Sequence, residues 1–261
     1  MRNKANNYEA KRGNGFITRM FFIFAVMILA FSMWNMKKIL DDYRTSDVSY
    51  ENARETYVQE KPVEDDEPGV HIKNVEKVVD FDSLQSINPD VIGWISINGS
   101  NIDYPIMKSK DNQDYLHTTF DKQYASAGSI FMDCRNSDSF DDYNTIIYGH
   151  NMKNGSMFHD LKKYLDEKAS AEISKEVDIY LPDGSIKKYS IISIRLTDAF
   201  SDSYQLSFDS LDAYENWLNG ICKTSQIVSE YDAHKPTLTL STCRGAQGGT
   251  ERLVVHLQPV D

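Results

Sequence analysis

The chain has 261 residues and a hydrophobic content of 41%, which suits one larger globular domain with appended segments. Its formal net charge of −11, with no lysine and arginine cluster interleaved with aromatic residues in the body of the chain, excludes nucleic acid as a partner. The three cysteines, Cys134, Cys222 and Cys243, are too few and too scattered for a disulfide framework, and they lack the paired spacing of a zinc site.

An uncharged, apolar run at residues 20–36 follows a basic segment at residues 1–19. At about 1.5 Å per residue the run nearly matches a hydrocarbon core of about 30 Å, and Arg19 and Lys37 can extend from its two ends. We therefore expect a transmembrane signal anchor with residues 1–19 in the cytoplasm. The alternatives are a signal peptide cleaved near Ala30, or a buried core helix.

Residues 37–79 become polar and acidic and include the stretch "EKPVEDDEPG". This composition predicts an extracellular stalk, helical around residues 40–57, that keeps the body away from the membrane surface. The globular domain is then expected to span residues 80–261.

The body alternates short runs rich in β-branched and aromatic residues with turn residues, and Asn98-Gly99-Ser100-Asn101 marks a hairpin. Helices are expected at residues 81–87, 156–168 and 208–221. Closure would remove the exposed edges of so many strands, which favours a mainly β fold, a barrel or a sandwich, decorated by helices. The eight predicted strands are residues 91–97, 102–107, 128–133, 144–150, 177–181, 186–197, 237–242 and 252–257.

The last two predicted strands carry a candidate nucleophile and a cation at one end. Alternation along residues 237–243 places Leu238 and Leu240 on one face and Ser241 and Cys243 on the other. If the two strands are neighbours, Arg252 lies near Cys243 at the same rim. A thiolate that attacks a peptide carbonyl creates an oxyanion, which a fixed guanidinium stabilises.

A thiol nucleophile also needs a partner that handles protons. His150 is the best candidate of the six histidines because it ends the strand-like run "NTIIYGH" just before a turn. Cys134 and Cys222 are interpreted as packing residues or as a pair. The other histidines lie in the stalk, in polar stretches, in a loop or within a strand, where a structural role is expected, and they are His71, His117, His159, His234 and His256.

Three motifs together make the chain resemble a class B sortase: "TLSTC" followed by an arginine opening the last strand, "YGHNM", and "INPDVIGWISINGSNIDYPIM". The resemblance covers residues from about 81 to the C-terminus. It implies an eight-stranded sortase-type β-barrel with N-terminal helices and a helix inserted between strands six and seven. It also implies a cysteine transpeptidase that needs no metal or organic cofactor, although some members of the wider family bind calcium.

The same resemblance assigns roles and partners. Cys243 resembles the nucleophile, His150 the general acid, and Arg252 the residue that orients the substrate and stabilises the oxyanion. Ser241 resembles a contact of the substrate backbone or of that arginine, and Asn112 and Leu116 resemble residues of the groove. The implied partners are secreted proteins with a sorting signal, NPQTN-like or related to LPXTG, and peptidoglycan or its precursor as the amine acceptor.

The segment after Cys243 departs from better-known class B relatives, which carry acidic or aromatic residues there. Here it is glycine-rich at residues 245–249 and begins with Arg244, a second candidate guanidinium. Two other functions stay open from the sequence: a thiol peptidase that transfers its acyl group to water, and a non-catalytic, membrane-tethered barrel that binds peptides.

Overall fold

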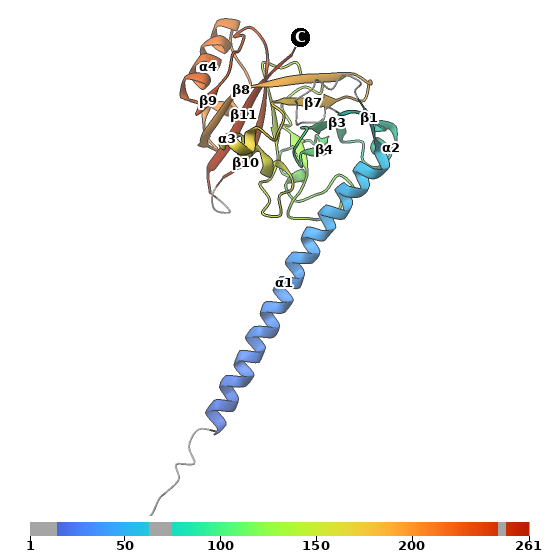
Figure 1. The fold of residues 1–261 in the computed structure, drawn as a ribbon, viewed down its shortest axis with the longest axis vertical. Helices are drawn as coiled ribbons and strands as arrows, with labels where there is room; N and C mark the ends of the chain where they lie inside the picture. The colour runs from blue at the N-terminus through green and yellow to red at the C-terminus, as the bar shows by residue number, and fades with distance from the viewer. Residues whose placement is uncertain (1–14, 63–74, 245–248, 261) are drawn as a thin grey trace, which may run out of the picture. The chain divides into compact units, whose positions relative to one another are not determined.

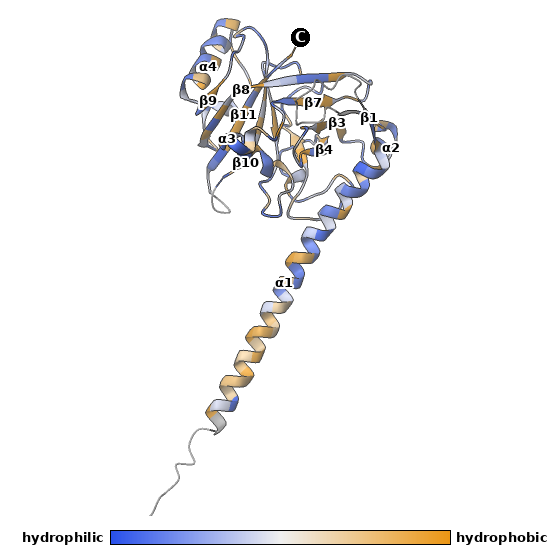
Figure 2. Ribbon diagram, in the orientation of Figure 1, coloured by the Kyte–Doolittle hydropathy of each residue, from blue (hydrophilic) through white to orange (hydrophobic). Residues whose placement is uncertain are grey.

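The computed structural model describes residues 15–62, 75–244 and 249–260, and it divides into two compact units, one ending at Asp42 and one comprising Tyr43–Asp261. Helix α1 (Gly15–Tyr57) supplies the first unit and continues into the second (Figure 1). Within the described residues, Ile17–Tyr57 is one helix long and apolar enough to cross a membrane. Figure 2 shows that the apolar residues of α1 occupy its N-terminal part and that polar residues follow toward its C-terminus. The membrane anchor itself stays a prediction.

The second unit is built around a closed β-barrel. Its sheet has the strand order β11-β10-β6-β5-β4-β3-β7-β8-β9, and an additional pairing between β11 and β8 closes eight of these strands into a ring. The short strand β9 (Ile227–Val228) extends β8 outside the ring. The barrel strands are β3 (Val91–Ser96), β4 (Asp103–Met107), β5 (Ile130–Met132), β6 (Asn144–Tyr148), β7 (Glu176–Tyr180), β8 (Ile186–Asp198), β10 (Thr237–Cys243) and β11 (Glu251–Pro259).

All eight strands expected from the sequence are present, and the closure selects the barrel over the sandwich. The alternation of the last two strands is also confirmed, since Leu238, Leu240, Leu253 and Val255 belong to the main hydrophobic core. The β3–β4 hairpin turns through Gly99, whose φ of 78° suits a glycine.

Two of the three expected helices form as predicted. Helix α2 (Phe81–Ile87) is capped by Asp80, whose side chain accepts a hydrogen bond from the Ser83 amide. Helix α4 (Leu211–Thr224) lies between the sixth and seventh barrel strands, β8 and β10, and begins after Ser210, whose side chain accepts a hydrogen bond from the Ala213 amide. Its buried residues Tyr214, Trp217, Leu218, Ile221 and Cys222 form a second hydrophobic cluster with Ile192.

The helical segment expected at residues 156–168 forms as two shorter helices. The structure has a 3-10 helix, η2 (Phe158–Leu165), followed by a short α-helix, α3 (Glu167–Ser170). Asp166 separates the two because it has an extended backbone, and its side chain accepts hydrogen bonds from the amides of Lys168 and Ala169. Two other 3-10 helices, η1 (Asp114–Leu116) and η3 (Asp202–Tyr204), border the site described below.

Part of the predicted stalk packs as a component of the barrel unit. Tyr50 and Ala53, at the end of α1, belong to the main core. Strands β1 (Val58–Pro62) and β2 (Val75–Val79) form an antiparallel pair, and Lys77 of β2 makes an ion pair of 2.7 Å with Asp103. Residues 43–57 and these two strands are therefore not a free spacer, because Tyr57, Val58 and Val79 also pack against the main core.

Candidate active site

Cys243 and Arg252 are paired in register on adjacent antiparallel strands. Cys243 is the last residue of β10, and its partner in the β10–β11 ladder is Arg252. Such directly opposite residues in a sheet have Cβ atoms about 4.5–5.5 Å apart. The two side chains therefore leave the same face of the sheet at the same rim, as the alternation of the sequence predicts.

His150 is attached to this rim from the other side of β10. Strand β6 runs parallel to β10 with Tyr148 beside Ser241. Beyond the ladder, the Gly149 amide donates to the Ser241 carbonyl at 3.1 Å, and Nδ2 of Asn151 donates to the Cys243 carbonyl at 3.0 Å. The residues on both sides of His150 are thus bound to the strand that carries Cys243.

Gly149 allows this approach because it has no side chain. A Cβ atom there would overlap with Ile130 Cδ1 and with the ring of Phe158. The sequence "YGH" therefore brings the backbone of β6 against packed side chains immediately before the histidine, and a larger residue would displace His150.

The His150 ring has a defined tautomer. Its Nε2 lies 2.9 Å from the carbonyl oxygen of Leu116. A carbonyl only accepts hydrogen bonds, so Nε2 carries the proton and the neutral ring has its lone pair on Nδ1. Burial lowers the pKa of His150 below its ordinary value against the hydrogen bond to Leu116, which raises it, and electrostatic interactions with His117 and Arg252 lower it further. The ring is therefore neutral at pH 7 and able to accept a proton.

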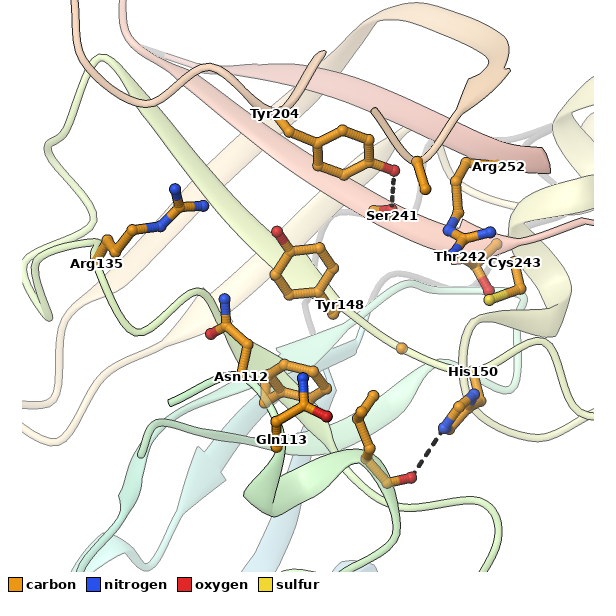
Figure 3. A pocket seen from close by; sticks show the side chains of 14 residues that line it. Asn112, Gln113, Arg135, Tyr148, His150, Tyr204, Ser241, Thr242, Cys243 and Arg252 are labelled. Carbon is orange, nitrogen blue, oxygen red and sulfur yellow. Dashed lines mark hydrogen bonds between the residues drawn. The ribbon is translucent and has the colours of Figure 1, made fainter. Parts of the chain in front are cut away.

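The guanidinium of Arg252 is fixed by the backbone around it. Its Nη1 donates to the carbonyl oxygens of Gly249 and Glu251, at 2.8 and 2.9 Å. Both of these hydrogen bonds to described residues are donated by Nη1, one of the three guanidinium nitrogens. Figure 3 shows Arg252, Cys243 and His150 together at one end of the pocket.

The three side chains border a pocket of about 350 Å³, within the range of small-ligand sites. All six residues expected to form the site line it, and no carboxylate is among the described lining residues. The lining residues are Asn112, Gln113, Leu116, Phe131, Arg135, Tyr148, Gly149, His150, Ala199, Tyr204, Ser241, Thr242, Cys243 and Arg252.

At the end of the pocket away from Cys243, where Figure 3 shows Asn112, Arg135 and Tyr148, the buried carboxylate of Asp133 binds all three side chains. Asp133 accepts from Nε and Nη2 of Arg135, each at 2.8 Å, from Nδ2 of Asn112 at 3.0 Å and from the Tyr148 hydroxyl at 2.9 Å. The Cys134 amide donates to Oδ1 of Asn112 at 2.8 Å. The Asn112 amide group is therefore held in one orientation from both ends.

Sequence reasoning missed Arg135, Tyr148 and Tyr204. Tyr148 could have been predicted, because it stands two residues before His150 in the expected strand and alternation places both side chains on the same face. Tyr204 had none, because it reaches the site from η3, within the insertion between β8 and α4.

Ser241 contacts Tyr204. Its Oγ lies 2.7 Å from the Tyr204 hydroxyl, and the Tyr204 ring stacks on that of Tyr148 with centroids 6.3 Å apart. The side chain of Ser241 is buried, so Tyr204 covers it at the pocket wall.

The remaining candidates lie outside the pocket. Cys134 and Cys222 are both free thiols, so they do not form the pair considered from the sequence. His256 is buried, with Nδ1 2.9 Å from Thr239 Oγ1, and has the structural role expected of it. Arg244 is exposed and does not line the pocket in the described part of the chain. His71 and residues 245–248 of the glycine-rich segment lie outside the described residues.

Comparisons with known proteins agree with this geometry. A family model described as a sortase domain matches residues 95–260. The chain is similar to sortase B of Listeria monocytogenes, with 32% identity over 220 residues that cover 83% of this chain and 85% of the relative. A crystal structure of sortase B from B. anthracis in complex with AAEK1 is similar at a TM-score of 0.71 and 31% identity, covering 85% of this chain and all of that one. A Staphylococcus aureus sortase B–substrate complex is similar at a TM-score of 0.63 and 30% identity, covering 69% of this chain and 84% of that one.

Proposed function

Because the chain belongs to the sortase family as a sortase B-type cysteine transpeptidase, we propose that it cleaves a C-terminal sorting signal after threonine and transfers the acyl group to a cell-wall amine. The observation that carries this proposal is the in-register pairing of Cys243 with Arg252, with the residues flanking His150 bound to the Cys243 strand. A thiol, an imidazole and a guanidinium at one pocket rim are the groups that acyl transfer through a thioester requires.

Acylation begins with transfer of the Cys243 proton to the neutral His150 ring. Sulfur then attacks the carbonyl carbon of the threonine, a C–S bond forms, and the carbonyl electrons move onto oxygen. Arg252 stabilises this oxyanion. When the tetrahedral intermediate collapses, the C–N bond breaks and the leaving amine takes the proton from His150, which is then neutral again.

Transfer to the acceptor reverses these roles. An amine of peptidoglycan or its precursor attacks the thioester carbon and loses a proton to His150. The new C–N bond forms as the C–S bond breaks, and the Cys243 sulfur recovers its proton. The enzyme returns to its starting state with no net consumption of a cofactor.

The groove for the signal extends from Cys243 toward Arg135. Leu116 supplies an apolar wall, while Asn112 and Ser241 contribute polar groups whose orientations are held by Asp133 and Tyr204. We propose that Asn112 and Leu116 contact the signal side chains. Because the Tyr204 hydroxyl is bound to Ser241, Ser241 contacts the signal backbone either through that hydroxyl or after the hydroxyl has moved away.

The proposed location follows from the first compact unit. The apolar part of α1 anchors the chain as a single-pass membrane protein, with residues 1–19 in the cytoplasm and the barrel unit outside, where secreted substrates and the cell wall meet. Fractionation of cells, followed by protease treatment of intact protoplasts, tests this orientation. Protection of the barrel from the protease would contradict it.

The function is tested with the full chain in detergent micelles, incubated with NPQTN and LPXTG peptides and with triglycine or diaminopimelate as acceptor. We expect mass spectrometry to detect an acyl-enzyme on Cys243 and an amide product that requires the added amine. An acid product that is unaffected by the amine would instead identify the hydrolytic peptidase. Absence of cleavage, with wild-type behaviour of Cys243→Ala in cells, would identify the peptide-binding barrel.

A further inference from the structure

The loop at residues 115–118 holds the His150 imidazole from two directions. The Leu116 carbonyl contacts the edge of the ring at Nε2, 2.9 Å away. The ring of the next residue, His117, stacks on its face, with centroids 5.8 Å apart and 12° between the planes. The edge contact limits rotation of the imidazole and the face contact limits its tilt. Together they set the direction of Nδ1, the nitrogen that exchanges protons.

This loop is itself bound by the segment at residues 125–129. The Ser129 amide donates to the Tyr115 carbonyl at 2.9 Å, and the Ser129 hydroxyl donates to the Thr118 carbonyl at 2.7 Å. The Ala125 amide donates to the His117 carbonyl at 3.0 Å. These three hydrogen bonds hold the backbone on both sides of Leu116 and His117, the two residues that contact His150.

Tyr50, near the end of α1, binds the same segment. Its hydroxyl donates to the Gly128 carbonyl at 2.6 Å and lies 2.9 Å from Ser129 Oγ. Its ring is 2% exposed and packs edge-on against Tyr104 at a centroid distance of 5.2 Å. One turn of α1 therefore contacts the residues that hold the loop under His150.

The backbone at Gly128 makes this contact close. Gly128 has a φ of 55°, and a Cβ atom there would overlap with the carbonyl oxygens of Tyr115 and Leu116. The carbonyl that receives the Tyr50 hydrogen bond thus belongs to a residue packed directly on the Leu116 peptide group. A shift of Gly128 would move the hydrogen-bond acceptor of His150.

We propose that Tyr50 and His117 are positioning residues for His150: His117 sets the tilt of the imidazole, and Tyr50 of α1 holds the loop that carries both contacts. The proposal rests on the function proposed above and adds that the last turns of the anchor-bearing helix support the acid–base group. Neither residue lines the pocket in the described part of the chain, so each acts through His150.

The electrostatic environment of His150 allows a second test of the role of His117, through the pKa of His150. The titratable or charged side chains that face it are His117 from the loop after η1, Arg252 from β11 and the Cys243 thiol from β10. The electrostatic interaction with His117 lowers the pKa of His150. Replacing His117 with phenylalanine removes this interaction and should therefore raise the pKa of His150 while the stacking is kept.

The first test compares Tyr50→Phe with Tyr214→Phe in the full chain in detergent micelles. Tyr214 is a matched control because it is also buried, its hydroxyl donates to the Lys235 carbonyl and it lies 2.7 Å from the Thr237 hydroxyl, at the end of β10 away from Cys243. We expect Tyr50→Phe to lower kcat by about 3- to 10-fold with KM within about twofold, the effect of one lost buried hydrogen bond. We expect Tyr214→Phe to change neither. Equal effects of the two variants, or none from Tyr50→Phe, would overturn the role of Tyr50.

The second test uses His117→Phe and His117→Ala. His117→Phe keeps a flat ring, so kcat should stay within about twofold, while the acid limb of the kcat/KM profile moves to higher pH. His117→Ala removes the stacked face and should lower kcat by about tenfold. An unchanged pH profile in the first variant, together with unchanged kcat in the second, would contradict the role of His117.

A substrate-free measurement separates this inference from the proposed function. Iodoacetamide labelling of Cys243, followed by peptide mass spectrometry from pH 5 to pH 9, reports the ease of thiol deprotonation. Tyr50→Phe should move the labelling midpoint to higher pH, because a displaced imidazole accepts the Cys243 proton less readily, and Tyr214→Phe should not. If the wild-type chain cleaves no signal, the proposed function fails and the labelling still decides the inference. If cleavage occurs and the midpoints coincide, the inference alone fails.

Discussion

Cys243 and Arg252 face each other across one rung of the β10–β11 ladder, and the guanidinium is held there by two backbone carbonyls. Arg252→Ala should lower kcat/KM by roughly 10²- to 10³-fold, because it removes the group that stabilises the oxyanion. Arg244→Ala is the matched control, since Arg244 is exposed and lies outside the pocket, and it should stay within about twofold. Steady-state kinetics on the full chain checks both. A larger effect from Arg244 would transfer the role to that residue.

The three thiols should differ in reactivity. Cys243 is exposed at the pocket, Cys134 is half-buried and Cys222 is buried, where desolvation raises its pKa. Limited alkylation, quantified by peptide mass spectrometry, should therefore label Cys243 first and Cys222 last. Cys243→Ala should remove all cleavage, while Cys134→Ala should keep it. Cleavage that survives in Cys243→Ala would disprove a thioester on that residue.

The lowered pKa of His150 predicts the acid limb of activity. As pH falls through that pKa the ring becomes protonated on Nδ1 and cannot accept the Cys243 proton, so kcat/KM falls. Because burial lowers the pKa, the midpoint should lie below about 6.5, the ordinary value for histidine. The pH profile of kcat/KM measures it. A midpoint above that value would contradict the burial of the imidazole.

The hydrogen bond between Ser241 and Tyr204 predicts energetic coupling at the pocket wall. Ser241→Ala and Tyr204→Phe each remove one partner of the same 2.7 Å contact. In a double-mutant cycle on kcat/KM their effects should be less than additive by about 0.5–1.5 kcal/mol. Independent, additive effects would show that each hydroxyl contacts the signal by itself.

His256 predicts a loss of stability in acid. Burial lowers its pKa to about 3, so the folded chain excludes a proton that the unfolded chain binds below about pH 6.5. Its contribution is present above pH 6.5 and is lost as pH falls toward 3, by about 2 kcal/mol between pH 7 and pH 5. Urea unfolding of wild type and His256→Leu at both pH values measures it. An equal loss in the variant would assign the acid sensitivity to other groups.

Local patterns predicted the parts of this protein that depend on periodicity. Alternation located the barrel strands and put Cys243 and Arg252 on one face, and the strand end before a turn located His150. The polar network around Asp133 was not predictable in this way, because Asn112, Asp133 and Tyr148 come from separate segments that only the pairing of β4, β5 and β6 in the sheet brings together. Neither was the packing of α1, because the apolar residues Tyr50 and Ala53 are isolated within a polar stretch.

Strand β11 is hydrogen-bonded on both sides, with Arg252 opposite Cys243 on β10 and opposite Thr197 on β8. The sulfur and the cation are consequently carried by paired strands of the sheet, whereas the imidazole belongs to the segment that follows β6. Adjustment of the three groups during turnover therefore falls mainly to the imidazole, and the Leu116 carbonyl and the His117 ring limit how far it moves.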